Sequence, residues 1–329
     1  SKSMATRGPD ANGLWIDNNI ALSHRRLSIL DLDMRANQPM LSDCGRYAIV
    51  FNGEIYNFHQ LRRDLEKNGE MFKTSSDTEV LLTLFIAKRE HMLRQLRGMF
   101  AFAIWDSKLC ELFLARDPYG IKPLYYSRKS EGFYFASEPK GLFAAGVERR
   151  DNLIAWSTYL SFGTYEHSNY TFFDDVCQLR PGHCATVTSD GEMRVETYYD
   201  FAKIMESSIN EKIKDEKRIS DEYLSTLNNA VDICFRSDVP VGLAISGGVD
   251  SSILMAMVRE SGQNSDQIKA FTYTCDDERY DEDPYMRSVA HHYNVKHYVT
   301  MMNPREFWED FPSTLWYQEE PTGSITITS

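Results

Sequence analysis

The residues with the clearest chemical capacity form one short segment, Ser246-Gly247-Gly248-Val249-Asp250-Ser251-Ser252. Apolar runs at 241–245 and 253–258 flank it, so the pattern predicts a strand, a tight loop and a helix. Paired glycines let backbone N–H groups approach an anion, and the helix N-terminus adds the positive end of its dipole. The serine hydroxyls can donate further hydrogen bonds, and Asp250 is placed to hold a divalent cation against bound phosphates.

No lysine follows the second glycine, which separates this loop from the Walker A loop. We therefore expect a nucleotide that gives up pyrophosphate rather than one that transfers a single phosphoryl group. The loop resembles the pyrophosphatase loop of the ATP-pyrophosphatase superfamily. An ordinary Gly/Ser turn is the alternative, and the ordered strand–loop–helix frame argues against it.

The composition limits the remaining classes. A chain of 329 residues, 42% hydrophobic and 26% charged, is typical of soluble globular protein and long enough for two domains. A net charge of −12 without a basic block argues against nucleic acid or a membrane as partner. Six cysteines without a CxxC pattern predict reduced thiols in the cytoplasm. The apolar runs are strand-sized and no leader is evident, so we expect no transmembrane helix or secretory signal.

Two different element patterns divide the chain. The first half predicts strands at 47–51, 99–105, 111–115, 124–126 and 132–136 and helices near 58–68 and over 78–96, with Asn52-Gly53 as a turn. The second half predicts a helix over 221–235, strands at 241–245, 268–274 and 296–301, and a helix over 283–293, hence a parallel, doubly wound sheet. A charged stretch poor in aromatics separates the halves, so we expect domains at 1–203 and 220–329 joined by a linker at 204–219.

Several motifs of the first half resemble the glutaminase domain of glutamine-dependent asparagine synthetases. They are Arg7-Gly8-Pro9-Asp10, His24-Arg25-Arg26-Leu27-Ser28-Ile29, Asn52-Gly53-Glu54-Ile55-Tyr56-Asn57, Ser76-Asp77-Thr78-Glu79, Gly98-Met99-Phe100-Ala101-Phe102 and the run from Ala115 to Leu124. With the pyrophosphatase loop, the likeness follows the family's order along essentially the whole chain. It implies an α+β N-terminal-nucleophile sandwich (class II glutamine amidotransferase), followed by an incomplete α/β doubly wound ATP-pyrophosphatase domain.

The resemblance also implies an activity and its ligands. Glutamine would be hydrolysed in the first domain, and ATP with Mg²⁺ would activate a carboxylate in the second as an acyl-adenylate. Channelled ammonia would then give the amide, with aspartate becoming asparagine as the default. A homodimer is a candidate assembly.

The family's glutamine site maps onto specific residues here. Arg26 suits the α-carboxylate. Glu54 and Asp77, with backbone carbonyls near Ile29 and Leu30, suit the α-ammonium. The Asn52 side chain and the Gly53 N–H would form the oxyanion hole. Taken singly, Asn52-Gly53 could be a hairpin turn, and Asp77 with Glu79 could cap the helix near residue 78.

The nucleotide site is expected at the carboxyl ends of the first two strands of the second sheet. It comprises Ala244, Ser246, Gly247, Gly248, Val249, Asp250, Ser251, Ser252 and Tyr273, with Asp250 as the metal ligand. The acidic run 276–283 is interpreted as a solvated loop with a helix N-cap at Asp281 or Asp283.

Two features depart from the family pattern. Its nucleophile is an N-terminal cysteine whose free α-amine assists proton transfer, whereas this chain begins Ser1-Lys2-Ser3-Met4. We therefore expect the nucleophile to be absent from the chain as given, together with glutaminase turnover. The family's later SGEGxDE-type loop has no match before Ser329, so the sequence is interpreted as the middle of a longer protein.

Two other readings remain open. The chain could belong to a relative that amidates another carboxylate, such as a sugar acid, or closes a ring. It could instead be a catalytically dead regulatory or binding module of the same fold. The retained glutamine residues argue against cyclases that have lost glutaminase activity, and the intact SGGVDSS loop argues against a dead module.

Overall fold

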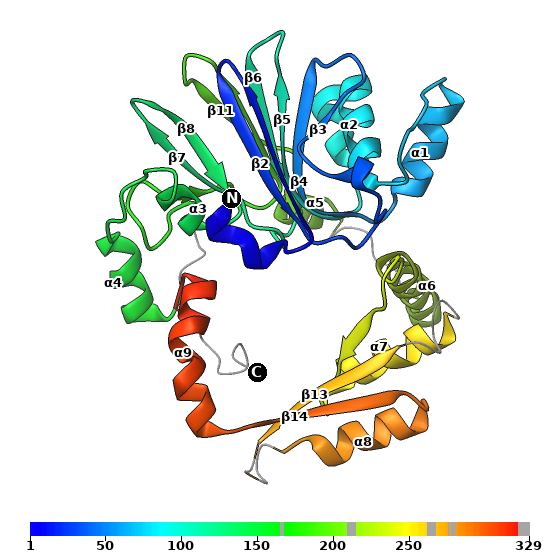
Figure 1. The fold of residues 1–329 in the computed structure, drawn as a ribbon. Coiled ribbons are helices and arrows are strands. Elements are labelled where there is room, and N and C mark those ends of the chain that lie inside the picture. Colours follow the sequence, from blue (N-terminus) through cyan, green and yellow to red (C-terminus); the bar gives the residue numbers. More distant parts are fainter. Residues whose placement is uncertain (165–167, 209–214, 262–267, 276, 278–280, 322–329) are drawn as a thin grey trace. The chain divides into compact units, whose positions relative to one another are not determined.

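The computed structural model describes residues 1–164, 168–208, 215–261, 268–275, 277 and 281–321. The chain forms two compact units, Ser1–Asn210 and Glu211–Ser329 (Figure 1). The boundary between them falls inside the segment 204–219 that the sequence predicts as a linker, and the domain limits themselves stay a prediction. No described helix is long and apolar enough to cross a membrane.

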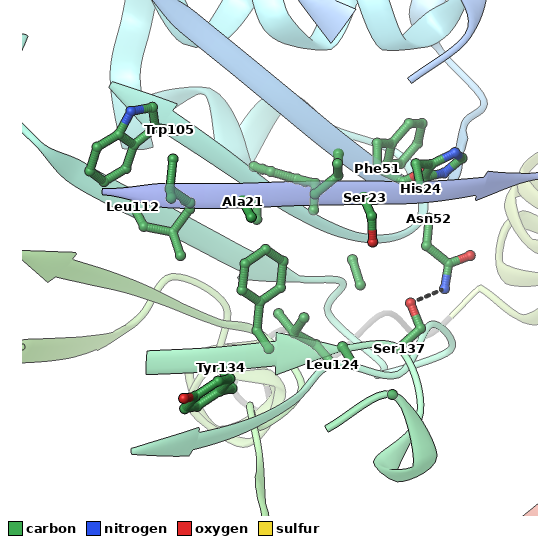
Figure 2. Close-up of a pocket in the computed structure, with 18 of the residues that line it drawn as sticks. Ala21, Ser23, His24, Phe51, Asn52, Trp105, Leu112, Leu124, Tyr134 and Ser137 are labelled. Carbon is green, nitrogen blue, oxygen red and sulfur yellow. Dashed lines mark hydrogen bonds between the residues drawn. The ribbon is translucent and has the colours of Figure 1, made fainter. Parts of the chain in front are cut away.

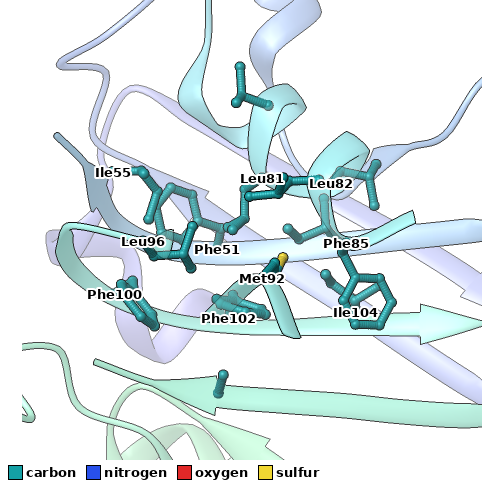
Figure 3. Packing of buried hydrophobic residues seen from close by; sticks show 14 of the residues in the cluster. Phe51, Ile55, Leu81, Leu82, Phe85, Met92, Leu96, Phe100, Phe102 and Ile104 are labelled. Carbon is teal, nitrogen blue, oxygen red and sulfur yellow. The ribbon is translucent and has the colours of Figure 1, made fainter. Parts of the chain in front are cut away.

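An antiparallel sheet of six strands organises the first unit, in the order β11-β10-β6-β5-β4-β3. Its strands are β3 (Met40–Leu41), β4 (Tyr47–Ile55), β5 (Gly98–Asp106), β6 (Glu111–Arg116), β10 (His183–Thr188) and β11 (Met193–Thr197). Helices α1 (Phe58–Lys67) and α2 (Asp77–Lys88) cover one face, and Figure 3 shows the apolar side chains packed between them and the sheet. Buried Phe51, Leu81, Phe85 and Phe102 belong to this cluster.

A second strand layer packs on the other face of the sheet. It contains the hairpin β1 (Ala11–Asp17) with β2 (Ile20–Arg26), and the small sheet β8 (Gly132–Ala136), β7 (Tyr125–Lys129) and β9 (Cys177–Gln178). Leu22, Val50, Ala103 and Leu114 are buried between the layers. Helix α3 (Pro139–Phe143) packs outside β7 and β8. The first unit is therefore an α+β sandwich, as the sequence predicts.

The second unit contains the predicted parallel α/β sheet. Strands β12 (Gly242–Ala244), β13 (Lys269–Cys275) and β14 (Lys296–Met302) pair in sequence order, all parallel. Helices α6 (Glu216–Cys234), α7 (Val249–Glu260) and α8 (Asp283–His292) share one apolar cluster with it. In β13, Ala270 and Thr272 are buried whereas Phe271 is 45% exposed, so the described helices cover one face.

The remaining described helices are shorter or peripheral. They are η1 (Lys2–Arg7), η2 (Met34–Ala36), η3 (Arg89–Gln95), α4 (Leu153–Phe162), α5 (Phe201–Ser208) and α9 (Pro304–Gln318).

The structure corrects the single helix predicted over 78–96. Helix α2 ends at Lys88, and Arg89, the first residue of the 3₁₀ segment η3, takes a positive φ of +51°. The Arg89 guanidinium lies 4.6 Å from the Phe85 ring centre and donates to Asp106 Oδ2 at 3.2 Å. These tertiary contacts hold the chain in the break, although the apolar spacing continues beyond it.

The predicted turn at Asn52-Gly53 is also wrong. Strand β4 continues through both residues to Ile55, because Gly53 and Ile55 pair with Phe100 and Gly98 of β5. A Cβ on Gly53 would lie 2.1 Å from the Met99 carbonyl oxygen. The glycine is thus required by the close approach of β5 rather than by a hairpin.

Candidate functional site

A cavity of about 1400 Å³ lies between the two strand layers of the first unit. Its lining comes from β2, β4, β5 and β8 and from the segments that follow them. Figure 2 shows Ser23 and His24 on β2 near Asn52, with Trp105 and Leu112 toward the opposite end. Every predicted glutamine-site residue lines this cavity: Arg26, Ile29, Leu30, Asn52, Gly53, Glu54 and Asp77. The fold therefore brings that set together, while the role of each residue stays a prediction.

Asn52 and Gly53 lie on β4, and Asn52 contacts the segment that follows β8. The Asn52 Nδ2 group donates to Ser137 Oγ at 3.4 Å (Figure 2). One amide hydrogen is thereby directed at Ser137 and the other remains for a ligand. An oxyanion hole formed by Asn52 and Gly53 stays a prediction. Ser137, which the sequence motifs did not identify, contacts the Asn52 amide.

Asp77 is buried at the first position of α2. Ser76 is the N-cap residue, with its Oγ accepting from Glu79 N, so the expectation that Asp77 might serve only as the cap is not what the geometry shows. Asp77 Oδ2 accepts instead from Ile55 N at 2.9 Å, which ties the helix to β4. Burial raises the pKa of Asp77 from 3.8 to about 6, against the opposing effect of its backbone hydrogen bonds.

Glu54 is half-buried beside Asp77. Burial first, and then repulsion by Asp77, raise the pKa of Glu54 from 4.5 to about 7, while Lys122 opposes the shift. Lys122 also lines the cavity, and burial lowers the pKa of its ammonium group. Two carboxylates with raised pKa values therefore face one cavity that could accept a cationic group.

A buried network around Arg116 and Asp117 positions Lys122. The Arg116 guanidinium donates to the carbonyls of Gly120, Lys122 and Leu179 and to Gln178 Oε1. The fully buried Asp117 carboxylate accepts from four backbone N–H groups, those of Phe100, Tyr119, Ile121 and Lys122. The loop that carries Lys122 is thereby fastened to β5 directly opposite Gly53.

Arg26 is buried and its terminal nitrogens are already engaged. Nη1 donates to Asp33 O and Asn37 Oδ1, and Nη2 donates to Leu30 O and Asp31 O. In this structure the guanidinium therefore stabilises the segment 30–37 through its two terminal nitrogens. Binding of an α-carboxylate by Arg26 stays a prediction and requires either Nε or a rearranged segment.

We expect Glu54→Gln to weaken glutamine binding at pH 8 by about tenfold or more, since a charge-assisted hydrogen bond is worth about 1.5–3 kcal/mol. The affinity of the unmodified chain should fall between pH 8 and pH 6, because Glu54, with a pKa of about 7, takes up a proton. The variant should show a flatter pH profile in calorimetry.

The melting temperature of Glu54→Gln distinguishes a loss of glutamine binding from misfolding. The folded-state pKa of Glu54 is raised, so its ionised form costs stability at pH 8, and that cost disappears as pH falls through 7 toward 4.5. Glu54→Gln should therefore not lower the melting temperature. The matched control is Glu70→Gln at an exposed site; equal losses in both variants would contradict the assignment.

The predicted pyrophosphatase loop joins β12 to α7 in the second unit. Ser246 N donates to Ser251 Oγ at 3.1 Å, and Ser251 Oγ donates to Ser246 O at 2.8 Å. Gly248 N donates to Ser246 Oγ, and Gly247 N donates to Glu282 Oε2 at 3.0 Å. The loop is thus ordered by its own hydrogen bonds at the start of a helix, a location that favours anions.

Asp250 lies exposed in the first turn of α7, and its carboxylate makes no hydrogen bond or ion pair with the described residues. Among those residues no three His, Cys, Asp or Glu side chains converge as a metal site. Mg²⁺ is usually held in proteins by one or two carboxylates together with substrate phosphates and water. Binding of Mg²⁺ by Asp250 stays a prediction.

Ala244 and Tyr273 lie near the carboxyl ends of neighbouring strands. Ala244 pairs with Phe271, and Tyr273 follows two residues later along β13 on the same face. That is the face the described helices leave open, where Ala244 is exposed and Tyr273 is partly exposed. Contact with adenine stays a prediction.

The acidic run 276–283 contributes more than a solvated loop. The predicted N-cap at Asp281 or Asp283 is wrong, because Glu282 is the N-cap residue of α8, although Asp281 Oδ1 accepts from Asp283 N at 3.0 Å. Glu282 instead reaches the pyrophosphatase loop. The sequence does not predict this contact of Glu282, because a run of acidic residues does not indicate which carboxylate contacts a loop 35 positions away.

Comparisons with known proteins match two separate families, one on each side of the boundary between the two units. Residues 1–199 match the family model of the glutamine amidotransferase domain, and residues 222–329 match that of asparagine synthase. The chain is 34% identical over 321 residues to asparagine synthetase (glutamine-hydrolyzing) 1 of Bacillus subtilis, covering 98% of this chain and 49% of that protein. It is 32% identical over 298 residues to asparagine synthetase (glutamine-hydrolyzing) 3 of the same organism, covering 88% and 46%.

A fungal protein with a different name is similarly related. The chain is 31% identical over 333 residues to Amidase chry2 of Gibberella zeae, covering 97% of this chain and 48% of that protein. The chain thus spans about half the length of these relatives.

Proposed function

This chain belongs to the glutamine-dependent asparagine synthetase family, and on that premise we propose that it takes part in glutamine-dependent, ATP-driven amide synthesis. The first unit binds glutamine for release of its amide nitrogen. The second unit binds ATP and activates a carboxylate as an acyl-adenylate, with release of pyrophosphate. Ammonia then attacks the acyl carbon and displaces AMP.

One observation carries the first half of this proposal, namely the pairing of Glu54 with Asp77 at the cavity. Raising the pKa values of two neighbouring carboxylates costs free energy that a cationic ligand would recover. The α-ammonium group of free glutamine is such a ligand. A glutamine residue within a protein substrate has no free α-ammonium group, so the two carboxylates favour free glutamine as the ligand.

The neighbouring groups suit the chemistry at the other end of the ligand. Attack on the glutamine amide produces a tetrahedral oxyanion, and preorganised donors aimed at it are usually a large catalytic contribution. The free hydrogen of Asn52 Nδ2 supports Asn52 as one donor. We assign the second to the Gly53 N–H, next to it on β4.

In the second unit, the loop 246–252 would hold the phosphates through backbone N–H groups and serine hydroxyls. When bound, Mg²⁺ would offset the negative charge that develops on the phosphates. Asp250 would orient the metal from the first turn of α7, and adenine would lie near Ala244 and Tyr273.

Aspartate is the proposed acceptor, since the relatives named as asparagine synthetases cover nearly the whole chain. A second candidate is amidation of a different carboxylate. The similarity to Amidase chry2, a relative with a different name, supports this second candidate.

Expression of the complete reading frame and assay of pyrophosphate release would test the proposal. We expect release that requires ATP, Mg²⁺, a carboxylate and either glutamine or ammonium. Aspartate should be the best acceptor in a panel that includes sugar acids. Release with another carboxylate alone would select the second candidate, and no release with any acceptor would contradict amide synthesis.

Asp250→Asn should weaken binding of Mg·ATP to the chain by roughly fivefold or more, the equivalent of about 1 kcal/mol, because it removes the charge that faces the metal. Calorimetry with and without Mg²⁺ measures this. Binding of ATP without metal should change little, and Asp221→Asn, at an exposed site on α6, is the matched control. Unchanged Mg·ATP affinity would remove Asp250 from the site.

A further inference from the structure

A carboxylate already accepts a hydrogen bond from one backbone N–H group of the predicted phosphate loop. Gly247 N, the first glycine N–H of the loop, donates to Glu282 Oε2 at 3.0 Å. The approach is close, because a Cβ built on Gly247 would lie 3.2 Å from the Glu282 Cβ. An anion held by a backbone N–H at the start of a helix is in the position that such loops offer to a phosphate.

The local fold leaves Glu282 free for this contact. Glu282 is the N-cap residue of α8, but its side chain accepts no hydrogen bond from that helix. Asp281 takes over the capping, with its Oδ1 accepting from Asp283 N and from the Thr274 hydroxyl. Of these two adjacent acidic residues, Asp281 thus stabilises the start of α8 and Glu282 contacts the loop.

We propose that Glu282 is an anionic latch that occupies the pyrophosphate position of the loop in the nucleotide-free protein and leaves it when nucleotide binds. The inference rests on the proposed nucleotide site and adds a regulatory contact to it. The Gly247 N–H cannot serve Glu282 and a phosphate oxygen equally well at the same time. A phosphate arriving beside Glu282 would also meet a like charge, which disfavours joint occupancy.

The latch predicts discrimination among anions. A polyphosphate that engages several loop donors can displace Glu282 and still gain hydrogen bonds. A single small anion makes few hydrogen bonds with the loop, so displacing Glu282 costs most of the free energy that those hydrogen bonds provide. Glu282 therefore keeps the loop closed to free phosphate.

The test is binding of inorganic pyrophosphate to the 329-residue chain by calorimetry, with and without Mg²⁺. Glu282→Ala should bind pyrophosphate about three- to tenfold more tightly in both conditions, since one competing hydrogen bond to a charged group is removed. Glu260→Ala is the matched control, because it removes the same charge from an exposed residue at the far end of α7. It should leave the affinity unchanged.

Each other outcome is informative. Equal affinity in Glu282→Ala and the unmodified chain overturns the latch alone. Weaker binding confined to Mg²⁺ conditions also overturns it and assigns Glu282 to the metal. Absence of pyrophosphate binding in every variant overturns both the latch and the nucleotide site.

The contact between Glu282 and Gly247 can also be tested without measuring an affinity. With ¹⁵N-labelled glycine, the amide resonance of Gly247 should move on Glu282→Ala without any ligand. It should move again in the unmodified chain when pyrophosphate is added. An unchanged Gly247 resonance in the ligand-free variant overturns the contact itself.

Discussion

Gly53→Ala should destabilise the first unit by about 3 kcal/mol or more and abolish glutamine binding. The added Cβ would lie 2.1 Å from the Met99 carbonyl oxygen and 2.7 Å from the Phe100 Cα. Both atoms belong to the backbone of β5, so β4 and β5 must move apart at the centre of the sheet. The φ of +151° adds strain for any residue with a side chain.

Gly132→Ala is a closely matched control. Gly132 has a φ of +159°, but a Cβ there would meet no atom within 4 Å. Its cost should stay near about 1 kcal/mol, which isolates the contact with β5 from the backbone strain. Urea unfolding with calorimetry of glutamine binding measures both effects. A Gly53→Ala chain as stable as Gly132→Ala would contradict the geometry of the β4–β5 pair.

Asp117→Asn should cost about 3–5 kcal/mol, because each buried N–H left without an acceptor costs about 1–3 kcal/mol. The carboxylate is fully buried and accepts from four backbone N–H groups, two on each oxygen. An amide replaces one of those oxygens with an NH₂ group that can only donate. The loop 117–122 should loosen, and Lys122 with it.

The control for this change is Asp43→Asn, which breaks the ion pair of the exposed residues Asp43 and Lys73. Exposed pairs are worth little, so its effect should stay within about 0.5 kcal/mol. Denaturant unfolding gives both values, and hydrogen exchange at Ile121 and Lys122 reports the loop directly. A cost for Asp117→Asn no larger than the control would mean that the four hydrogen bonds contribute no net stability.

The parts of the fold that follow local rules could be predicted from the sequence. The SGGVDSS segment does lie between a short strand and a helix, since glycine and serine at that junction leave few alternatives. Helix α1 and most strands match their periodicity. The glutamine-site residues share one cavity because the motifs preserve the arrangement of a whole fold.

The remaining features depend on contacts between distant segments. Strand β4 continues past Asn52 only because residues 98–100 pair opposite it, whereas the dipeptide alone favours a turn. Helix α2 stops at Lys88 where the Arg89 guanidinium reaches Asp106. The terminal nitrogens of Arg26 are taken up by carbonyls of its own following loop. No propensity or spacing encodes these outcomes.

The raised pKa values at the cavity would also make the proposed binding of glutamine a proton-release reaction. Near neutral pH about half of the Glu54 carboxyls carry a proton, because that is the population at a pH equal to the pKa. An α-ammonium group placed beside Glu54 favours the ionised form and expels that proton, and linkage makes the effect reciprocal. The measured heat of binding should then vary with the ionisation enthalpy of the buffer. In the cell, acidification alone would reduce how much glutamine the site captures.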